Sequence, residues 1–370
     1  MSKKKSSFRH FTKRFLLIVN IIVSILLAYP LYITPLPFIW INGFLEIAAP
    51  YLILAEVLLL LLWLLAKPIM TLLPLISLGL VWQTIMALFA WHPGGQFTPQ
   101  KKQGSLRIVS WNIKEFNGNQ KNRSQHKFRA ESIADAIQKW NPDIICLQEY
   151  NTKERPNDAA NHAQYFNKKY PYSFFSKDYQ TNEPEYFAGC IIYSKYPIID
   201  SKRMAFNNGE SLIYATLQKG DDTIRVYTSH LASYRFNQND FEPNASPDNE
   251  LIVKANFNVL KKMKEAFVER AVQANMIRSE LDKSSYPTII TGDFNDVPGS
   301  YTYRTIRGNW QDAFLSKGLG IGSTYLGISP TLRIDYILPN KNWEVKGWES
   351  VDENLSDHHM VMADLLLLKK

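Results

Sequence analysis

The first ninety or so residues differ from all that follow, and this difference restricts the fold more than any single motif. After a basic start, three apolar segments occupy 15–32, 47–66 and 69–90. About 20 apolar residues are enough to cross a bilayer as a helix. The remaining residues have the composition of a soluble protein, with strand-like and helix-like segments in alternation. The sequence therefore predicts a membrane region joined to a separate soluble domain.

The middle apolar segment contains an acid, Glu56, and Glu46 lies at its edge. A carboxylate at the bilayer centre costs about 2.5–3.5 kcal/mol on insertion scales. The leucine run at 58–62 offsets this cost, so we expect about three transmembrane helices. The simpler interpretation of Glu56 is a carboxylate that faces a neighbouring helix, and a proton or ion relay is the alternative.

The basic residues around these segments predict an orientation. Six of them precede the first span, namely Lys3, Lys4, Lys5, Arg9, Lys13 and Arg14, and Lys67 follows the second. By the positive-inside rule the N-terminus is cytoplasmic, and three crossings place the soluble domain outside the cytoplasm. If the Glu56 segment does not cross, the soluble domain is cytoplasmic instead. The same cluster supplies much of the net charge of +8, so charge is weak support for a nucleic-acid partner.

These features divide the chain into three parts. Residues 1–92 form the membrane region of an integral membrane protein, and residues 93–104 form a linker of Pro, Gly and polar residues. Residues 105–370 form the soluble domain. We expect the bilayer as one partner, and the sequence indicates no protein partner.

Several predicted strands of the soluble domain are apolar and end in a polar residue. These ends are Asn112, Glu149, His230 and Asp293, with Asn295 two residues further on. Amphipathic helices are expected over 128–140 and 251–281. Because strand ends that meet at one edge of a sheet are where α/β proteins place their sites, we expect these side chains to converge.

Each of these residues fits the chemistry of phosphate-ester cleavage. Glu149 and Asn112 offer the hard oxygen atoms that Mg²⁺ or Mn²⁺ prefers. Asp293 can orient or take a proton, and Asn295 can donate a hydrogen bond to a phosphate oxygen. Taken singly, each residue has a simpler explanation. Glu149 would be a solvated acid, Asn112, Asp293 and Asn295 would be turn residues, and His230 would be an imidazole in the core.

A second group comes from the last part of the chain, where Asp357 and His358 are adjacent. His358 requires a carboxylate to fix its tautomer, and Asp335, which lies in an apolar strand, is the natural candidate. Asp357 would then face the metal. The set matches what metal-assisted hydrolysis requires.

In their order along the chain, these motifs resemble the endonuclease/exonuclease/phosphatase superfamily. The motifs are Ser-Trp-Asn at 110–112, Leu-Gln-Glu at 147–149, Gly189 with Tyr-Ser-Lys-Tyr-Pro at 193–197, Thr-Ser-His-Leu at 228–231, Thr-Gly-Asp-Phe-Asn at 291–295, Arg-Ile-Asp-Tyr at 333–336 and Ser-Asp-His at 356–358. The resemblance implies a four-layer α/β sandwich of two packed mixed sheets flanked by helices. It also implies a magnesium-type site and hydrolysis by an activated water.

The resemblance assigns roles to single residues. Asn112 and Glu149 match the metal side, with Asp357 as a further ligand. His230 matches a histidine that binds or protonates the phosphate. Asp293 would orient or deprotonate the water, Asn295 would hold the phosphate, and Asp335 with His358 would form the His-carboxylate pair. Whether the Asp or a His is the general base stays open, as does the number of metal ions.

Four functions remain for this set of residues. The first is a nuclease, because Ser-His-Leu around His230 resembles deoxyribonuclease-like members. The second is a sphingomyelinase-type lipid phosphodiesterase, to which a membrane anchor gives direct access. A small-phosphoester phosphatase and an inactive, membrane-tethered binding module are the others. The polar, aromatic-bearing stretch at 234–255 is predicted to be a mobile loop over the site, and it could serve either of the first two substrates.

Two cysteines, Cys146 and Cys190, each lie in an apolar strand-like run. A disulfide between them is one interpretation. Buried strand cysteines are more often small apolar fillers, which is the other.

Overall fold

The structure is a computed structural model that describes residues 2–32, 39–93, 97–116, 123–156, 158, 160–180, 185–236, 249–327 and 330–368. The chain forms two compact units. The helical unit consists of Met1–Leu88, Tyr234–Val268 and Val297–Tyr301. The sheet unit consists of Phe89–Ser233, Glu269–Asp296 and Thr302–Lys370. The predicted boundaries at residues 92 and 105 stay predictions.

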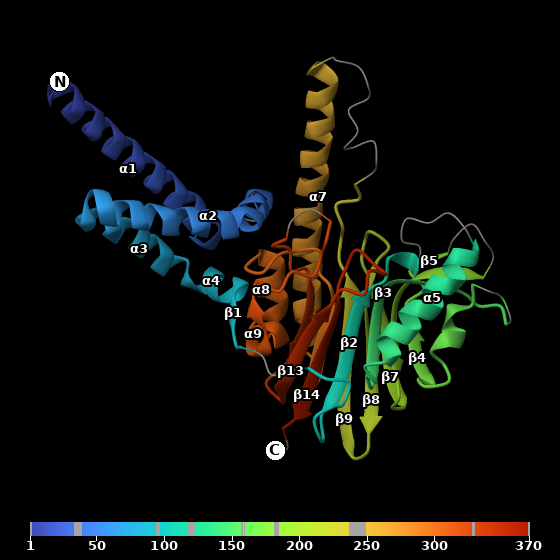
Figure 1. The fold of residues 1–370 in the computed structure, drawn as a ribbon. Helices are drawn as coiled ribbons and strands as arrows, with labels where there is room; N and C mark the ends of the chain where they lie inside the picture. The colour runs from blue at the N-terminus through green and yellow to red at the C-terminus, as the bar shows by residue number, and fades with distance from the viewer. Residues whose placement is uncertain are drawn as a thin grey trace. The chain divides into compact units, whose positions relative to one another are not determined.

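The apolar N-terminal region is helical (Figure 1). Its elements are α1 (Ser2–Tyr32), α2 (Ile39–Ala66), the short 3₁₀ helix η2 (Pro68–Thr71), α3 (Leu72–Leu80) and α4 (Trp82–Leu88). Among the described residues, two helical stretches are long and apolar enough to cross a membrane, His10–Leu31 and Trp40–Ala66, and a bent helix pair would be a third. The third predicted span is not one straight helix, because Pro68–Leu80 and Trp82–Leu88 meet at a bend of 62°. The bend follows Gly79, a residue of low helix propensity.

The acid in the second span is buried against the first span. Glu56 has no exposed surface. Its carboxylate accepts hydrogen bonds from Asn20 Nδ2 and Ser24 Oγ, both at 2.7 Å. Trp63 Nε1 donates in turn to Asn20 Oδ1 at 3.1 Å. The prediction that Glu56 faces a neighbouring helix is confirmed.

The sheet unit is built on two large sheets. The first has the order β13-β14-β2-β3-β6-β4, with β5 paired to β6. Its strands are β2 (Leu106–Asn112), β3 (Ile144–Lys153), β4 (Tyr172–Phe175), β5 (Tyr179–Gln180), β6 (Tyr186–Ser194), β13 (Trp343–Val351) and β14 (Met360–Leu367). The second has the order β12-β10-β9-β8-β7. Its strands are β7 (Ile198–Ala205), β8 (Ser211–Lys219), β9 (Asp222–His230), β10 (Thr288–Asp293) and β12 (Asp335–Pro339).

The remaining elements lie around these sheets. They are η3 (Lys114–Phe116), α5 (Arg123–Gln138), η4 (His162–Tyr165), α7 (Asn249–Leu281), α8 (Tyr301–Arg307) and α9 (Ala313–Lys317). A two-stranded ribbon pairs β1 (Ala90–Trp91) with β11 (Leu319–Gly320). Of the predicted loop at 234–255, residues 237–248 lie outside the described residues, and α7 begins at Asn249.

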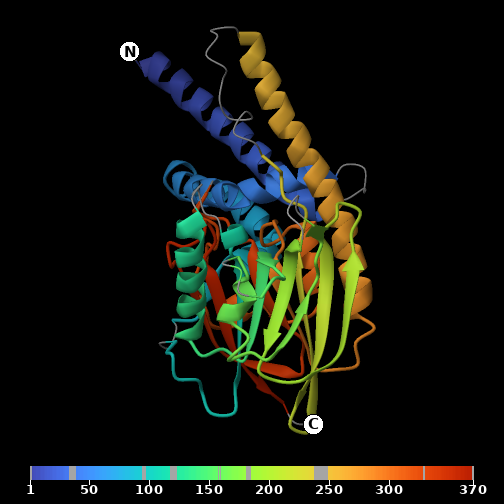
Figure 2. The same ribbon diagram turned by 90° about the vertical axis from the view of Figure 1, so that its right-hand side faces the viewer.

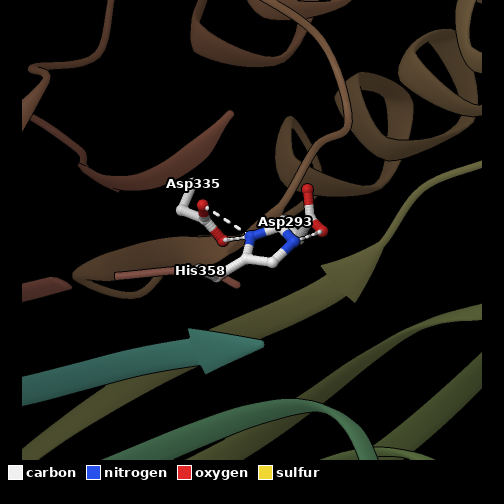
Figure 3. A group of neighbouring side chains, drawn as sticks. All are labelled: Asp293, Asp335 and His358. Carbon is white, nitrogen blue, oxygen red and sulfur yellow. Dashed lines mark hydrogen bonds and ion pairs between the residues drawn. The ribbon is translucent and has the colours of Figure 1, made fainter. Parts of the chain in front are cut away.

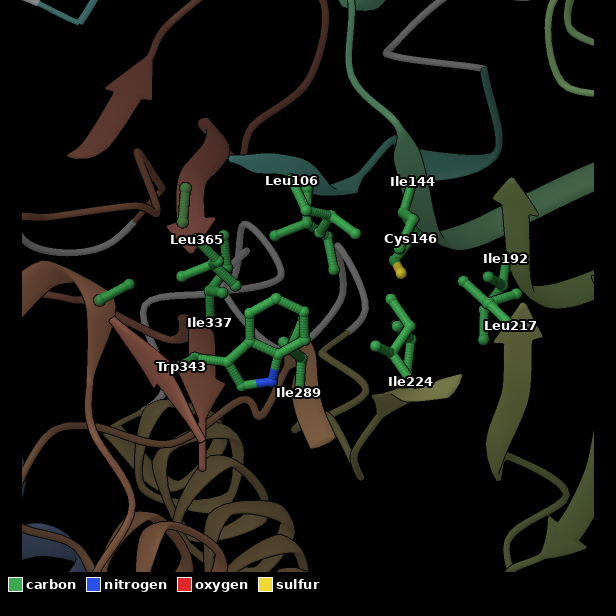
Figure 4. Packing of buried hydrophobic residues seen from close by; sticks show 14 of the residues in the cluster. Leu106, Ile144, Cys146, Ile192, Leu217, Ile224, Ile289, Ile337, Trp343 and Leu365 are labelled. Carbon is green, nitrogen blue, oxygen red and sulfur yellow. The ribbon is translucent and has the colours of Figure 1, made fainter. Parts of the chain in front are cut away.

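Two apolar cores show why the sheets and helices form layers. Between the sheets, residues such as Ile144 and Cys146 of the first face Ile224 and Ile289 of the second (Figure 4). A second core packs Ile133 and Ile137 of α5 against the first sheet. The C-terminal part of α7 lies on the other side of the two sheets (Figure 2). The unit is therefore the predicted four-layer α/β sandwich.

Both cysteines are free thiols within this unit. They belong to the core between the sheets and are essentially unexposed. Burial raises the pKa of the Cys146 thiol well above its usual range. The interpretation as small apolar fillers is confirmed.

Candidate active site

Three neighbouring strands of the second sheet bring three of the predicted site residues into one row. Asp293 of β10 pairs with His230 of the parallel strand β9 and with Asp335 of the antiparallel strand β12. Neighbouring strands lie about 4.8 Å apart, so hydrogen-bonding registers of this kind place side chains within reach of one another. Asp293 and Asp335 are both almost fully buried.

The first sheet supplies the facing residues. Asn112 ends β2, Glu149 lies in β3, and His358 comes two residues before β14. Asn112 connects the two sheets, because its Nδ2 lies 3.0 Å from both Glu149 Oε1 and Asp293 Oδ2 and donates to each. Its Oδ1 accepts the backbone N–H of Lys114 at 3.0 Å. The predicted convergence of strand ends is therefore present, with the Asn112 amide between two carboxylates.

The sequence placed Glu149 at a strand end, and this was wrong. β3 continues to Lys153, and its register with β6 shifts between Leu147 and Tyr150. Glu149 lies in this bulge with a φ of +49°. A bulge inserts one residue into a strand and re-aims its side chain, which is common beside active sites. The bulge therefore lets a mid-strand glutamate reach the site.

Gly292 is required by the close approach of the neighbouring strand. Its φ is +141°, and a Cβ atom there would lie 2.0 Å from the carbonyl oxygen of Ser229. No side chain fits at that distance. Gly292 thus fixes how β9 and β10 bring His230 and Asp293 together.

His358 lies between two acids (Figure 3). Its Nδ1 is 3.0 Å from Asp335 Oδ2, and its Nε2 is 3.7 Å from Asp293 Oδ2. Burial alone would lower the pKa of His358, but the charges of Asp335 and Asp293 outweigh it and raise the pKa to about 10. The predicted Asp335–His358 pair is therefore formed, and the imidazole can carry a proton between the two carboxylates.

His230 has a different set of partners. Its Nε2 is 3.6 Å from Asp293 Oδ2 and 3.0 Å from Asn295 Nδ2, and its Nδ1 is 3.6 Å from Glu210 Oε1. Burial alone would lower the pKa of this imidazole, but the negative charges of Glu210, Asp293 and Glu149 outweigh it and raise the pKa. Asn295 also donates to the Leu231 carbonyl at 2.9 Å. His230 and Asn295 therefore form a joint polar surface beside Asp293.

Asp357 lies next to these groups but has a cation as its partner. Its Oδ2 is 2.7 Å from Lys114 Nζ. Burial alone would raise the pKa of the Asp357 carboxyl, but the hydrogen bond from Lys114 and the charge of His358 outweigh it and lower the pKa. The carboxylate is therefore ionised and paired with an ammonium group.

Two sets of residues in this site have the donor atoms of a metal centre. Asp293, Asp335 and His358 hold ligand atoms within 4.8 Å of one another. In that set, however, the imidazole already bridges the two carboxylates. Glu149 is the better candidate, because its side chain is 33% exposed and its Oε1 lies beside Asp293 across the Asn112 amide. A magnesium-type ion uses one or two protein carboxylates and keeps water as further ligands, which suits this open position.

Sequence reasoning missed some residues of the site. Glu210 precedes β8 and carries no local signal that relates it to His230. Tyr325 lies against His358 with ring centroids 4.9 Å apart. Thr324 Oγ1 accepts the backbone N–H of Asp335 at 3.1 Å. The position of Lys114, two residues after Asn112, was a local signal that could have placed this lysine near the site.

The chain is similar to a known protein family. The chain matches the model of the Endonuclease/Exonuclease/phosphatase family over residues 109–358. No curated protein matches the chain.

Three solved structures show how far the similarity extends. The human Nocturnin catalytic domain with bound sulfate anion is 16% identical over 72% of this chain and 96% of its own, at a TM-score of 0.50. An endonuclease/exonuclease/phosphatase from Beutenbergia cavernae DSM 12333 is 17% identical over 72% of both chains, at a TM-score of 0.48. D. rerio TDP2 complexed with single strand DNA product is 16% identical over 71% of this chain and 99% of its own, at a TM-score of 0.48. The likeness to Nocturnin concerns the fold alone. The family match covers most of the chain and all of the predicted site residues, so this chain belongs to the endonuclease/exonuclease/phosphatase family.

Proposed function

We propose that this protein is a membrane-anchored, divalent-metal-dependent phosphodiesterase that hydrolyses nucleic acid by an activated water. Its family consists in general of hydrolases that act on phosphoester bonds. The observation that carries the proposal is the Asn112 amide between Glu149 and Asp293, with His358 held next to Asp293. This arrangement combines a metal-ligand candidate with an acid/base pair at one point of the sheet unit.

The donor set fits the metal that the family generally requires. Glu149 and Asp293 meet at one neutral amide. The two neighbouring imidazoles are shared with two further carboxylates, Glu210 and Asp335, so the site can accept more positive charge. Glu149 would hold Mg²⁺ or Mn²⁺, with Asp293 beside it, and Asn112 would orient both carboxylates. When bound, the ion supplies Lewis-acid stabilisation of charge on the phosphate.

Asp293 and His358 would handle the proton of the attacking water. Asp293 Oδ2 lies within 3.7 Å of the Nε2 atoms of both histidines. Asp293 would orient the water, and Asp335 would hold the His358 ring by accepting at Nδ1. A fixed acid/base group of this type contributes about 10²–10⁴-fold to the rate.

His230 and Asn295 would hold the phosphate. The raised pKa of His230 favours its charged form, which can donate to a phosphate oxygen. Asn295 would donate through its amide. The nearby Glu210 carboxylate orients the ring through Nδ1 at 3.6 Å.

Nucleic acid is the proposed substrate class because the Ser-His-Leu sequence at His230 resembles that of deoxyribonuclease-like members. A lipid phosphodiesterase of sphingomyelinase type is the second candidate. It is favoured by the two apolar helices, which would keep the site at a lipid surface. The basic N-terminus supports a cytoplasmic start, and if the bent pair Pro68–Leu80 and Trp82–Leu88 is a third crossing, the sheet unit is extracytoplasmic.

The test is hydrolysis by the full-length protein in detergent micelles and in vesicles. Single- and double-stranded DNA, RNA and sphingomyelin would be supplied with Mg²⁺ or Mn²⁺, with and without chelator. Chelator-sensitive cleavage of nucleic acid that is lost in Asp293→Asn supports the proposal. Headgroup release alone supports the lipid candidate, and inactivity on every diester contradicts both.

A further inference from the structure

Lys114 lies at the edge of the proposed site and has no part in the proposed hydrolysis. Its Nζ is 2.7 Å from Asp357 Oδ2, and the two side chains are 38% and 30% exposed. Exposed ion pairs contribute about 0–1 kcal/mol to stability. Stability alone therefore does not explain why the chain places an ammonium group at this point.

The backbone that carries Lys114 is strained. Lys114, Glu115 and Phe116 have φ angles of +48°, +54° and +57°. The left-handed conformation costs about 1–2 kcal/mol for each residue other than glycine. Such strain persists only where the surroundings enforce it, and it gathers at functional sites. Three strained residues in succession mark this turn as a feature that requires a reason.

Packing beyond the lysine holds the turn in place. Phe116 is fully buried, with ring centroids 5.6 Å from Tyr150 and 4.3 Å from His162. Asn151 Nδ2 donates to the Glu115 carbonyl at 2.9 Å. These contacts fix the direction in which the chain leaves β2, and with it the start of the Lys114 side chain.

Asn112 connects this turn to the carboxylates. Its Oδ1 accepts the Lys114 N–H at 3.0 Å, while its Nδ2 donates to Glu149 and Asp293. One side chain therefore sets the position of the lysine turn and of the proposed metal ligand together. The backbone of Lys114 is therefore held in a fixed relation to the proposed metal ligand.

An ammonium group and a divalent ion compete for the same carboxylate oxygen. Lys114 already occupies Asp357 Oδ2, and a divalent ion there would meet a positive charge at short range. We infer that Lys114 is a built-in cation that takes the place of a second divalent ion beside Asp357, so that the centre binds a single metal ion, at Glu149. The inference rests on the proposed function, and it removes Asp357 from the predicted metal ligands.

Mn²⁺ titration followed by electron paramagnetic resonance tests the inference on the full-length protein in detergent. We expect the wild type to bind a single Mn²⁺ per chain. Glu149→Gln should weaken binding by about tenfold or more, and Asp357→Asn by less than about twofold. Lys114→Met should free Asp357 and create a second, weaker site. The matched control Lys114→Arg keeps the positive charge and should keep the single site, and adding Asp357→Asn to Lys114→Met should remove the second.

The outcomes separate the two proposals. Two ions in the wild type, a loss of affinity in Asp357→Asn equal to that in Glu149→Gln, or a single site in a folded Lys114→Met would each overturn the inference. The Asp357→Asn result stands even if Lys114→Met fails to fold. A wild type that binds no Mn²⁺ and hydrolyses no diester would instead overturn the proposed function.

Discussion

Glu56 of the helical unit and Asp293 of the sheet unit are buried to nearly the same degree, at 0% and 1% exposure, but their partners differ in kind. Both oxygens of Glu56 accept short hydrogen bonds from neutral donors, Asn20 and Ser24. Around Asp293 the neighbours are titratable groups, among them His230 and His358. A buried carboxylate can therefore be a structural contact or a chemical group, and the partners decide which.

The groups around Glu56 and around Asp293 also differ in charge, which supports this distinction. In the helical unit a single acid meets an amide and a hydroxyl group, and these two neutral donors join its helix to the neighbouring one. In the sheet unit Glu149, Asp293 and Asp335 gather more negative charge than the neutral donors can offset. Such accumulation is costly unless cations enter, and it is common where an enzyme binds a metal or moves protons.

The largest expected effect comes from Asp293→Asn. Because the amide keeps the shape but cannot take a proton, we expect kcat/KM for a phosphodiester to fall by about 10²–10⁴-fold. Thermal unfolding should occur at an unchanged or slightly lower temperature, because the amide fills the same space but no longer attracts the imidazoles of His230 and His358. Steady-state kinetics and circular dichroism measure both. Reduced stability with intact activity would make Asp293 a structural acid like Glu56.

Adding metal ions is the next test of the difference between the acids of the site and Glu56. Adding Mg²⁺ or Mn²⁺ at 100 times its dissociation constant should stabilise the sheet unit by about 2.7 kcal/mol. Differential scanning calorimetry with and without chelator measures the shift. Glu149→Gln, with binding weakened about tenfold or more, should lose about half of this stabilisation or more, and Glu56→Gln should keep it. An equal shift in both variants would mean that the ion acts elsewhere.

The contrast between the two acids could be predicted from sequence only in part. Glu56 stands alone in an apolar helix, so a neighbouring helix was its expected partner. Asp293 follows an apolar strand within Gly-Asp-Phe-Asn, and continuous apolar runs locate buried strands well. The predicted strand ends Asn112 and His230 are the last residues of the observed β2 and β9 for that reason.

Other parts depend on contacts that no local pattern records. β7 and β13 are edge strands with few fully buried residues, and sequence analysis did not identify them. The bulge at Glu149 arises from the register with β6, which lies further along the chain. Lys114 meets an acid 243 residues away. Such pairs exist only after the sheets have packed.

A smaller effect is expected from Glu56→Ala, which leaves the buried amide and hydroxyl donors of Asn20 and Ser24 without their acceptor. Removing such a contact between membrane helices costs about 0.6–2 kcal/mol. Titration of the detergent-solubilised protein with sodium dodecyl sulfate, read through tryptophan fluorescence, measures the loss, since Trp63 belongs to the cluster. The kcat for a soluble diester should not change. A large loss of kcat would give Glu56 the relay role that its neutral partners argue against.

The smallest effect is expected from the two cysteines, which pack against apolar side chains. Cys146 and Cys190 are free thiols in the core between the sheets. Because burial excludes reagents and raises the pKa of the Cys146 thiol, neither should react with maleimide until the sheet unit unfolds. A reducing agent should leave the unfolding temperature unchanged. Mass spectrometry after labelling counts the modified thiols, and two additions to the native protein would mean that this core opens far more readily than the site that it supports.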